Sequence, residues 1–145
     1  MLIFDPIGFT AGSWDLLHAG HVGFLSKCLV NCDTLIVGLH VNPSIERPYK
    51  NKPIQSTTER YLQLSAIQGI TTIIPYETES DLTNIIAIMD IDKYFIGGDH
   101  EGETPTGFDI CEKRKIEIIY IPRLHNYSSS DLRTRICTAK TFSTK

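Results

Sequence analysis

The stretch IGFTAGSWDLLHAGH, residues 7–21, indicates the first two elements of secondary structure. Its first five residues, 7–11, are mostly apolar and predict a short strand. Beyond the stretch, the apolar residues Val22, Leu25 and Leu29 recur at the three- and four-residue spacing of a helix. The stretch therefore predicts a strand that turns into a helix, with the polar residues and glycines lying in the turn between them.

The same alternation of short apolar runs and helical periods continues along the rest of the chain. Further strands are predicted at 34–39, 72–76, 94–97 and 116–121, and further helices at 57–68, from the N-cap Ser80, at 107–115 and from Ser128. Five alternations predict an α/β fold of Rossmann-like, three-layer type, in which helices cover both faces of a parallel five-stranded sheet. The length of 145 residues predicts one domain, 1–145, and residues 42–56 form its one long loop.

Composition and charge exclude several classes of protein. A net charge of −3 without a Lys/Arg-rich stripe argues against a nucleic-acid binder held by phosphate charge. No apolar run approaches the roughly 18 residues of a membrane helix, and the opening residues lack the pattern of a signal peptide. The four cysteines have no Cys-x-x-Cys spacing, so neither a zinc cluster nor a disulfide framework is expected. We therefore expect a cytoplasmic protein with no membrane partner.

His18 and His21 are the residues of the first turn best suited to chemistry. Side chains three apart at the start of a helix share a face, so both imidazoles can point at one object. The helix start adds free backbone N–H groups and the positive end of the helix dipole, and the glycines of the turn allow a ligand to approach. This combination predicts an anion site. The alternatives are two surface histidines or half of a metal site, although no third zinc ligand is nearby.

The topology rule for parallel sheets directs attention to three loops. Ligands of such sheets bind beyond the carboxyl ends of the strands, where the strand order switches. The loops that follow predicted strands and carry polar residues are 12–21, 97–102 and 123–130.

The first of these loops carries a family resemblance. Its sequence GSWDLLHAGH, 12–21, resembles the nucleotidyltransferase superfamily signature, which reads Gly-Thr-Phe-Asp-Leu-Leu-His-x-Gly-His in small cytidylyltransferases. Two further segments match the family: RLHNYSSS at 123–130, an arginine followed by a serine triplet, and the Glu-Arg pair at 59–60. The resemblance covers about residues 7–136, and the nearest match is the glycerol-3-phosphate cytidylyltransferase type. It implies transfer of CMP from CTP to a small phosphorylated alcohol, with release of pyrophosphate and formation of a CDP-alcohol.

The resemblance also implies roles for individual residues. The catalytic residues would be His18, His21, Lys52 and Arg123, with the histidines donating hydrogen bonds in the transition state. The nucleotide would contact Gly12, Ser13, Trp14, Asp15, His18, Gly20, His21, Gly98, Asp99, Arg123, Tyr127, Ser128, Ser129 and Ser130. The phosphorylated acceptor would contact Asn42, Lys50 and Arg60. Mg²⁺ would bridge the phosphates as cofactor without a metal site built from protein ligands, and the chain would form a homodimer.

Several alternatives remain open at this point. The Gly-Gly-Asp sequence at 97–99 also resembles sugar-phosphate adenylyltransferases of the ADP-heptose type, which would use ATP and a sugar 1-phosphate. A non-catalytic nucleotide-binding module that regulates a partner is a third possibility. Lys50 could replace Lys52 at the phosphates, and Arg60 could instead form a structural ion pair. His40 and His125 receive no role.

Overall fold

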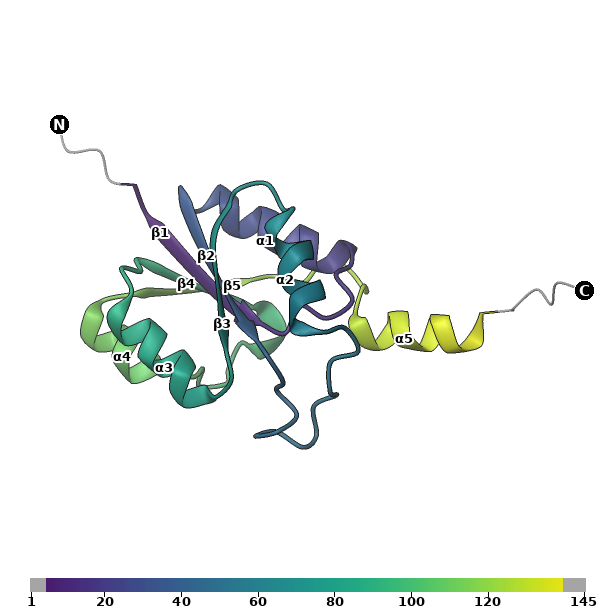
Figure 1. The fold of residues 1–145 in the computed structure, drawn as a ribbon. Coiled ribbons are helices and arrows are strands. Elements are labelled where there is room, and N and C mark those ends of the chain that lie inside the picture. Colours follow the sequence, from purple (N-terminus) through teal and green to yellow (C-terminus); the bar gives the residue numbers. More distant parts are fainter. Residues whose placement is uncertain (1–4, 140–145) are drawn as a thin grey trace, which may run out of the picture.

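One parallel sheet organises the computed structural model, which describes residues 5–139. Its strands are β1 (Ile7–Gly12), β2 (Thr34–His40), β3 (Ile70–Tyr76), β4 (Lys93–Gly97) and β5 (Glu117–Ile121). They lie in the order β3-β2-β1-β4-β5, and every pairing is parallel (Figure 1). The strand order switches between β1 and β4, so the loops after these two strands border the crevice where such sheets bind ligands.

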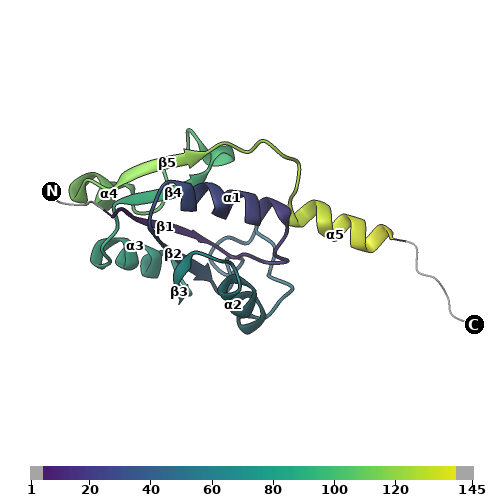
Figure 2. The ribbon, with the colours of Figure 1, turned by 90° about the horizontal axis from the view of Figure 1, so that it is seen from above.

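Helices cover both faces of this sheet. The helices α1 (Ala19–Val30) and α2 (Thr57–Ser65) pack on one face, whereas α3 (Glu79–Ile88) and α4 (Phe108–Arg114) pack on the other. The last helix, α5 (Ser129–Thr138), extends away from the sheet and buries none of its residues (Figure 2). A short 3₁₀ turn, η1 (Gly98–His100), follows β4. The predicted α/β, Rossmann-like three-layer fold with a parallel five-stranded sheet is thus confirmed.

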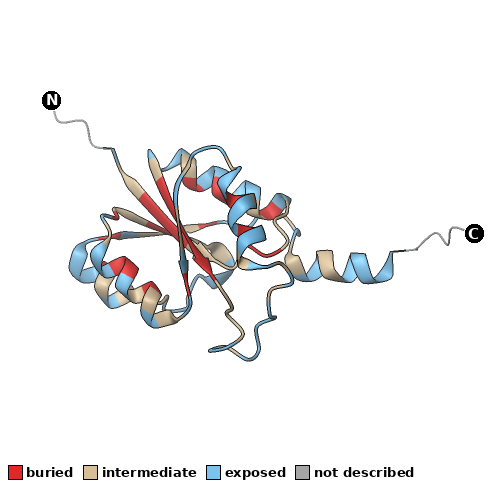
Figure 3. Ribbon diagram, in the orientation of Figure 1, coloured by how far each residue is buried: buried red, intermediate tan, exposed pale blue. Residues whose placement is uncertain are grey.

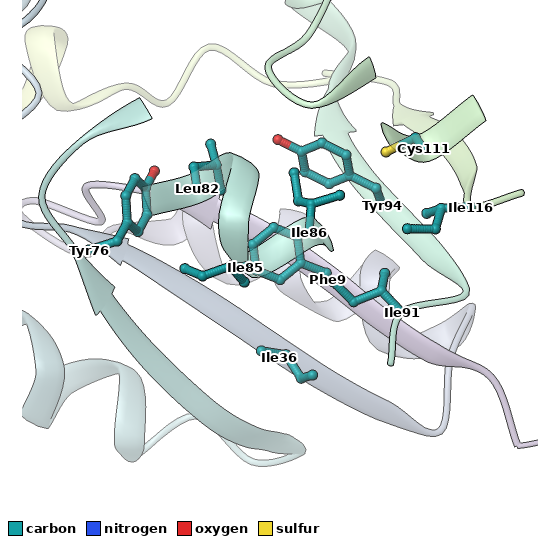
Figure 4. Packing of buried hydrophobic residues seen from close by; sticks show 10 residues of the cluster. All are labelled: Phe9, Ile36, Tyr76, Leu82, Ile85, Ile86, Ile91, Tyr94, Cys111 and Ile116. Atoms are coloured by element: carbon teal, nitrogen blue, oxygen red, sulfur yellow. The ribbon is translucent and has the colours of Figure 1, made fainter. Parts of the chain in front are cut away.

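The core consists of two apolar clusters, one on each side of the sheet. Successive side chains of a strand point to opposite faces, so Leu35 and Val37 of β2 join the cluster under α1 and α2, while Ile36 joins the one under α3 and α4. Figure 3 shows the central strands as the most buried part of the molecule, and Figure 4 shows the cluster that includes Phe9 and Ile86. Each such buried side chain contributes about 1.5–3 kcal/mol relative to exposure.

Two helix boundaries differ from the sequence predictions. Helix α3 begins after Thr78 rather than Ser80, because the Thr78 hydroxyl accepts the Asp81 N–H and the Asp81 carboxylate accepts the Thr78 N–H. This reciprocal capping box satisfies two N–H groups and outcompetes the later serine. Helix α2 ends at Ser65, and the chain reaches β3 through Gly69 at φ 97°, a left-handed conformation that favours glycine. No helix within residues 5–139 has the length and apolar character needed to cross a membrane.

Candidate active site

A cavity of about 540 Å³ lies at the carboxyl ends of β1 and β4, where the strand order switches. We call it the first cavity. The predicted site residues that line it are Gly12, Ser13, Trp14, His18, Gly20, His21, Lys50, Asp99, Arg123, Tyr127, Ser128 and Ser129. The tertiary structure therefore brings together two sequence motifs that are about 100 residues apart.

The histidine pair forms the start of α1. The His18 Nδ1 accepts the Gly20 N–H at 3.0 Å, and the His21 Nδ1 accepts the His18 N–H at 3.3 Å. The two rings stack, with centroids 3.8 Å apart and planes inclined by 24°. A neutral imidazole that accepts through Nδ1 carries its proton on Nε2. Both rings can therefore donate an N–H to a ligand in the cavity.

Burial keeps both histidines in this neutral form. Burial and, to a lesser extent, the neighbouring His18 lower the pKa of His21 to about 4 against the opposing effect of Asp15. Burial also lowers the pKa of His18, and the proximity of His125 and of the Arg123 guanidinium acts in the same direction. Because both pKa values are lowered, the two rings are uncharged near pH 7. The pair then acts as two hydrogen-bond donors rather than as two cations.

Trp14 supports the ring of His21. Its backbone has φ 54°, which is unusual for a bulky residue. The buried indole donates its Nε1–H to the carbonyl of Gly38 at 3.0 Å, and its ring meets that of His21 edge-on at 5.4 Å. The Trp14 side chain thus packs in the core beneath the turn and contacts the ring of His21.

The segment before α5 closes the opposite side of the first cavity. The Arg123 guanidinium donates to the carbonyl of Tyr127 at 2.7 Å and lies 3.3 Å from a carboxylate oxygen of Asp99. The Ser128 hydroxyl accepts the N–H of Asp131 as the cap of α5, and the Ser129 hydroxyl donates to a backbone carbonyl. Both hydroxyls are thus used in hydrogen bonds within the protein. An anion at the start of α5 would instead meet the free backbone N–H groups of that helix.

Asp15 does not line the cavity, although the resemblance implied nucleotide contact. Its buried carboxylate accepts the N–H groups of Ile54 and Gln55, each at 2.9 Å, and pairs with Arg133 at 2.8 Å. Burial opposes ionisation of Asp15, but these hydrogen bonds outweigh it and lower the pKa. Asp15 therefore fastens the end of the long loop and α5 to the turn that carries the histidines.

Arg60 is also placed differently from the acceptor-binding role that the resemblance implied. The side chain is 1% exposed. Its guanidinium donates to the backbone carbonyls of Ser13 at 2.9 Å, His40 at 2.7 Å and Val41 at 2.7 Å. Its Nε–H donates to the carbonyl of Gln55 at 3.2 Å. These bonds occupy the planar fork of donors, so Arg60 joins the ends of β1 and β2 to α2 and offers nothing to an acceptor.

The remaining predicted residues divide between cavity and surface. Lys50 lines the first cavity, whereas the Lys52 side chain is exposed and lines neither this cavity nor the two beside it. The Asn42 side chain accepts the N–H of Ser44 in a local turn and lies outside the cavities. Ser130 also lies outside them.

Gly98 lines a separate cavity, which Arg123 and His125 also line. We call it the third cavity, because a second one is described below. A side chain on Gly98 would lie 2.8 Å from the Ile121 carbonyl. Only glycine therefore permits β4 and β5 to approach each other at this point.

A second cavity, of about 470 Å³, adjoins the first on the α3 face of the sheet. The two share the β1 terminus, residues 11–13, and Lys50. Glu79 at the start of α3 connects the walls of the second cavity, because its carboxylate pairs with Arg47 at 3.0 Å and accepts the Thr106 hydroxyl at 2.7 Å. Its floor includes Tyr76 and Tyr94, which belong to the cluster of Figure 4.

Sequence reasoning missed several residues of these cavities. His40, Arg47 and Glu79 line the second cavity, and His125 lines the first. His40 directly follows the apolar run 34–39, and His125 lies inside the quoted segment 123–130. Their positions after strands were the available indication, since such loops border the site in this class of fold.

Comparisons with known proteins agree with this arrangement. The family model described as cytidylyltransferase-like matches residues 9–135. The bifunctional protein HldE of Hyphomonas neptunium is 34% identical over 135 residues, which make up 92% of this chain and 28% of that protein. HldE of Wolinella succinogenes is 37% identical over 111 residues, 76% of this chain and 23% of that protein. The chain thus spans about a quarter of the length of these curated relatives.

Solved structures share the fold. The lipopolysaccharide core biosynthesis protein from Thermoplasma volcanium superposes with a TM-score of 0.67 at 20% identity, over 86% of this chain and 100% of that one. Pantothenate synthetase from Thermus thermophilus superposes with a TM-score of 0.62 at 13% identity, over 92% of this chain and 64% of that one. At these identities the likeness is one of fold. The family match, by contrast, extends over most of the sequence and both motifs, and by that match the chain belongs to the cytidylyltransferase-like family.

Proposed function

We propose that this domain is a nucleotidyltransferase that transfers AMP from ATP to a sugar phosphate, in the manner of the ADP-heptose type. The observation that carries the reaction class is the pair of neutral, stacked imidazoles in a cavity that a second cavity adjoins at the β1 terminus. The choice of ATP and a sugar phosphate is supported by the HldE relatives and by the Gly-Gly-Asp sequence at 97–99.

In this reaction an oxygen of the acceptor phosphate attacks the α-phosphorus of ATP. The bond from the α-phosphorus to the bridging oxygen of the β-phosphate breaks, and pyrophosphate leaves. The chemistry requires positioning and stabilisation of developing negative charge more than an acid or base. His18 and His21 would donate their Nε2–H groups to the phosphate that reacts, while Arg123 and the α5 start would hold the leaving group.

The second cavity is the proposed place for the acceptor. It adjoins the first at residues 11–13, so an acceptor phosphate there could approach a nucleotide bound beside the histidines. Arg47 and Lys50 supply positive charge to its walls, and Glu79 and Thr106 supply polar atoms of the kind that bind sugar hydroxyls. Lys50 takes the phosphate-binding role that the resemblance gave to Lys52.

Mg²⁺ belongs to the proposal as a companion of the nucleotide. Within residues 5–139 no group of three or more His, Cys, Asp or Glu side chains converges to hold a metal ion. Mg²⁺ that accompanies a nucleotide is held mainly by phosphate oxygens, water and one or two carboxylates, and Asp99 is a carboxylate that lines the first cavity. We expect EDTA to abolish turnover and added Mg²⁺ to restore it, whereas turnover in metal-free buffer would contradict this part.

The test of the whole proposal is pyrophosphate release from ATP, CTP, GTP and UTP, each paired with sugar 1-phosphates, glycerol 3-phosphate, other phosphorylated polyols and FMN. We expect ATP with a sugar 1-phosphate to give the highest kcat/KM. CTP with glycerol 3-phosphate is the second candidate, favoured by the similarity of residues 12–21 to the cytidylyltransferase signature. A clear preference for that pair would contradict adenylyl transfer, and nucleotide binding without turnover of any pair would indicate a regulatory module.

The homodimer also stays a proposal. Helix α5 projects from the body with Ile136 exposed, and such a helix could pack against a second copy (Figure 2). Light scattering coupled to size-exclusion chromatography would measure the mass in solution, and a monomer at micromolar concentration would contradict it.

A further inference from the structure

His125 lines the first cavity together with His18 and His21, and its ring is held in the same way as that of His18. The His125 Nδ1 accepts the N–H of Tyr127, two residues onward, at 3.1 Å. In His18 the Nδ1 likewise accepts the N–H of Gly20, two residues onward, at 3.0 Å. When Nδ1 accepts a hydrogen bond in a neutral imidazole, Nε2 carries the proton. In their neutral form, His18, His21 and His125 therefore share one tautomer, with a donor on Nε2.

Gly20 shows how closely His125 approaches the histidine pair. A methyl group at Gly20 would lie 2.7 Å from Cε1 of His125 and 2.9 Å from Cε1 of His18. Cε1 is bonded to both ring nitrogens, so in each ring Nε2 lies one bond from the atom that approaches Gly20. The His125 ring thus meets the start of α1 beside His18, although the two residues belong to segments at opposite ends of the chain.

The same segment carries the guanidinium of the site. Arg123 is two residues before His125, lines the same cavity, and is fastened to the carbonyl of Tyr127 at 2.7 Å. Tyr127 therefore receives Arg123 on its carbonyl and gives its N–H to His125, so one peptide segment holds both side chains. A ligand in the first cavity that contacts the histidine pair and Arg123 therefore has His125 on the wall of the same cavity.

We propose that His125 binds the triphosphate of the nucleotide through its Nε2–H, beside His18, as a third phosphate-binding imidazole. The inference rests on the proposed function for the identity of the ligand. It also gives Gly20 a second purpose, because any side chain there would push the His18 and His125 rings away from each other. Preorganised neutral donors of this kind stabilise phosphate charge without the repulsion that three cations would create.

The test measures binding of inorganic tripolyphosphate by isothermal titration calorimetry, which needs neither the right base nor the right acceptor. The variants are His125→Ala, His125→Gln, and Leu124→Ala as the matched control. Leu124 is the neighbouring residue, is 81% exposed, and lines none of the three cavities described above. Thermal unfolding of each variant checks that the fold is retained.

We expect His125→Ala to weaken tripolyphosphate binding by about tenfold to a hundredfold, the effect of one hydrogen bond to a charged group. His125→Gln should restore binding to within about threefold of the wild type, because its amide keeps an N–H donor, and Leu124→Ala should bind as the wild type does. With a transferable nucleotide the same order should appear in kcat/KM.

Three results would overturn the inference, and they are distinguishable. If the wild type binds tripolyphosphate and His125→Ala binds it equally well, His125 has no part in phosphate binding while the proposed function stands. If His125→Gln binds as weakly as His125→Ala, the ring acts through packing rather than through a donor, and the inference is wrong as well. If the wild type binds no tripolyphosphate at all, the inference and the proposed function fail together.

Discussion

The imidazole rings of His18 and His21 stack at 3.8 Å between centroids, and His21 accepts the backbone N–H of His18. Each ring is therefore held by the helix start that it helps to form, with Nε2 left for a ligand. The arrangement is that of preorganised donors, which lower a barrier most when the charge that they meet appears only in the transition state.

Replacing either histidine should therefore affect turnover more than binding. We expect His18→Ala and His21→Ala each to lower kcat on the order of 10²-fold or more, with a much smaller change in the nucleotide KM. Steady-state kinetics of pyrophosphate release measure both parameters. Val22→Ala, a truncation of a half-exposed side chain on the same helix, is the control and should leave kcat unchanged. A large rise in KM with kcat intact would contradict the role.

Stability should depend on pH through His21. Its pKa falls from 6.5 to about 4 on folding, so between these values the unfolded chain binds a proton that the folded chain does not. The free energy of unfolding should therefore be highest above pH 6.5 and should decrease as the pH falls toward 4. Urea unfolding of the wild type and His21→Gln at several pH values should show a shallower decrease in the variant. Parallel curves for the two proteins would show that His21 titrates normally.

Arg123 should determine nucleotide affinity. Arg123→Ala removes a guanidinium that lines the first cavity, and we expect the nucleotide KM to rise by about tenfold or more, as for loss of a hydrogen bond to a charged group. The nucleotide KM of Arg123→Lys should lie between those of Arg123→Ala and the wild type, because a lysine keeps the charge but loses the planar fork. Nucleotide kinetics that do not change in Arg123→Ala would remove this residue from the site.

Replacing Arg60 should lower the stability of the fold rather than weaken binding of the acceptor. Its truncation would leave several buried carbonyls without donors and a cavity beside them, so Arg60→Ala should lower the free energy of unfolding by on the order of 3 kcal/mol or more. Arg60→Lys should also be strongly destabilised, since one ammonium cannot replace the fork. Chemical denaturation measures this effect. Normal stability together with a raised acceptor KM would instead support the role that the family resemblance implied.

The Asp15–Arg133 pair should be energetically coupled, because the Asp15 carboxylate is buried and the pair joins α5 to the turn that carries the histidines. A double-mutant cycle with Asp15→Asn and Arg133→Gln should give a coupling energy of about 1–2 kcal/mol. The exposed pair Asp131–Arg135 within α5 is the matched control and should give no more than about 0.5 kcal/mol. Equal coupling in the two pairs would mean that α5 is not held through Asp15.

Much of the fold followed from local pattern. Five strands and the helices between them were predicted within a few residues, because apolar periodicity and turn residues act over distances of about ten residues along the chain. The difference at the start of α3 is also local in origin. Thr78 rather than Ser80 caps this helix, because Asp81 lies three residues after Thr78 and completes a capping box with it. The two motifs at 12–21 and 123–130 also marked the walls of the first cavity in advance.

Side-chain direction could not be predicted in the same way. Asp15 lies in the family motif yet faces Ile54 and Arg133, and Arg60 turns inward to the ends of β1 and β2, because these partners come from distant segments that only folding brings near. For the same reason no local pattern assigned a role to Glu79, and the position of His125 inside the segment 123–130 did not show where its ring points. The periodicity of the chain specifies which segments become strands and helices, whereas contacts between segments far apart in sequence decide which polar groups are used by the fold and which remain for a ligand.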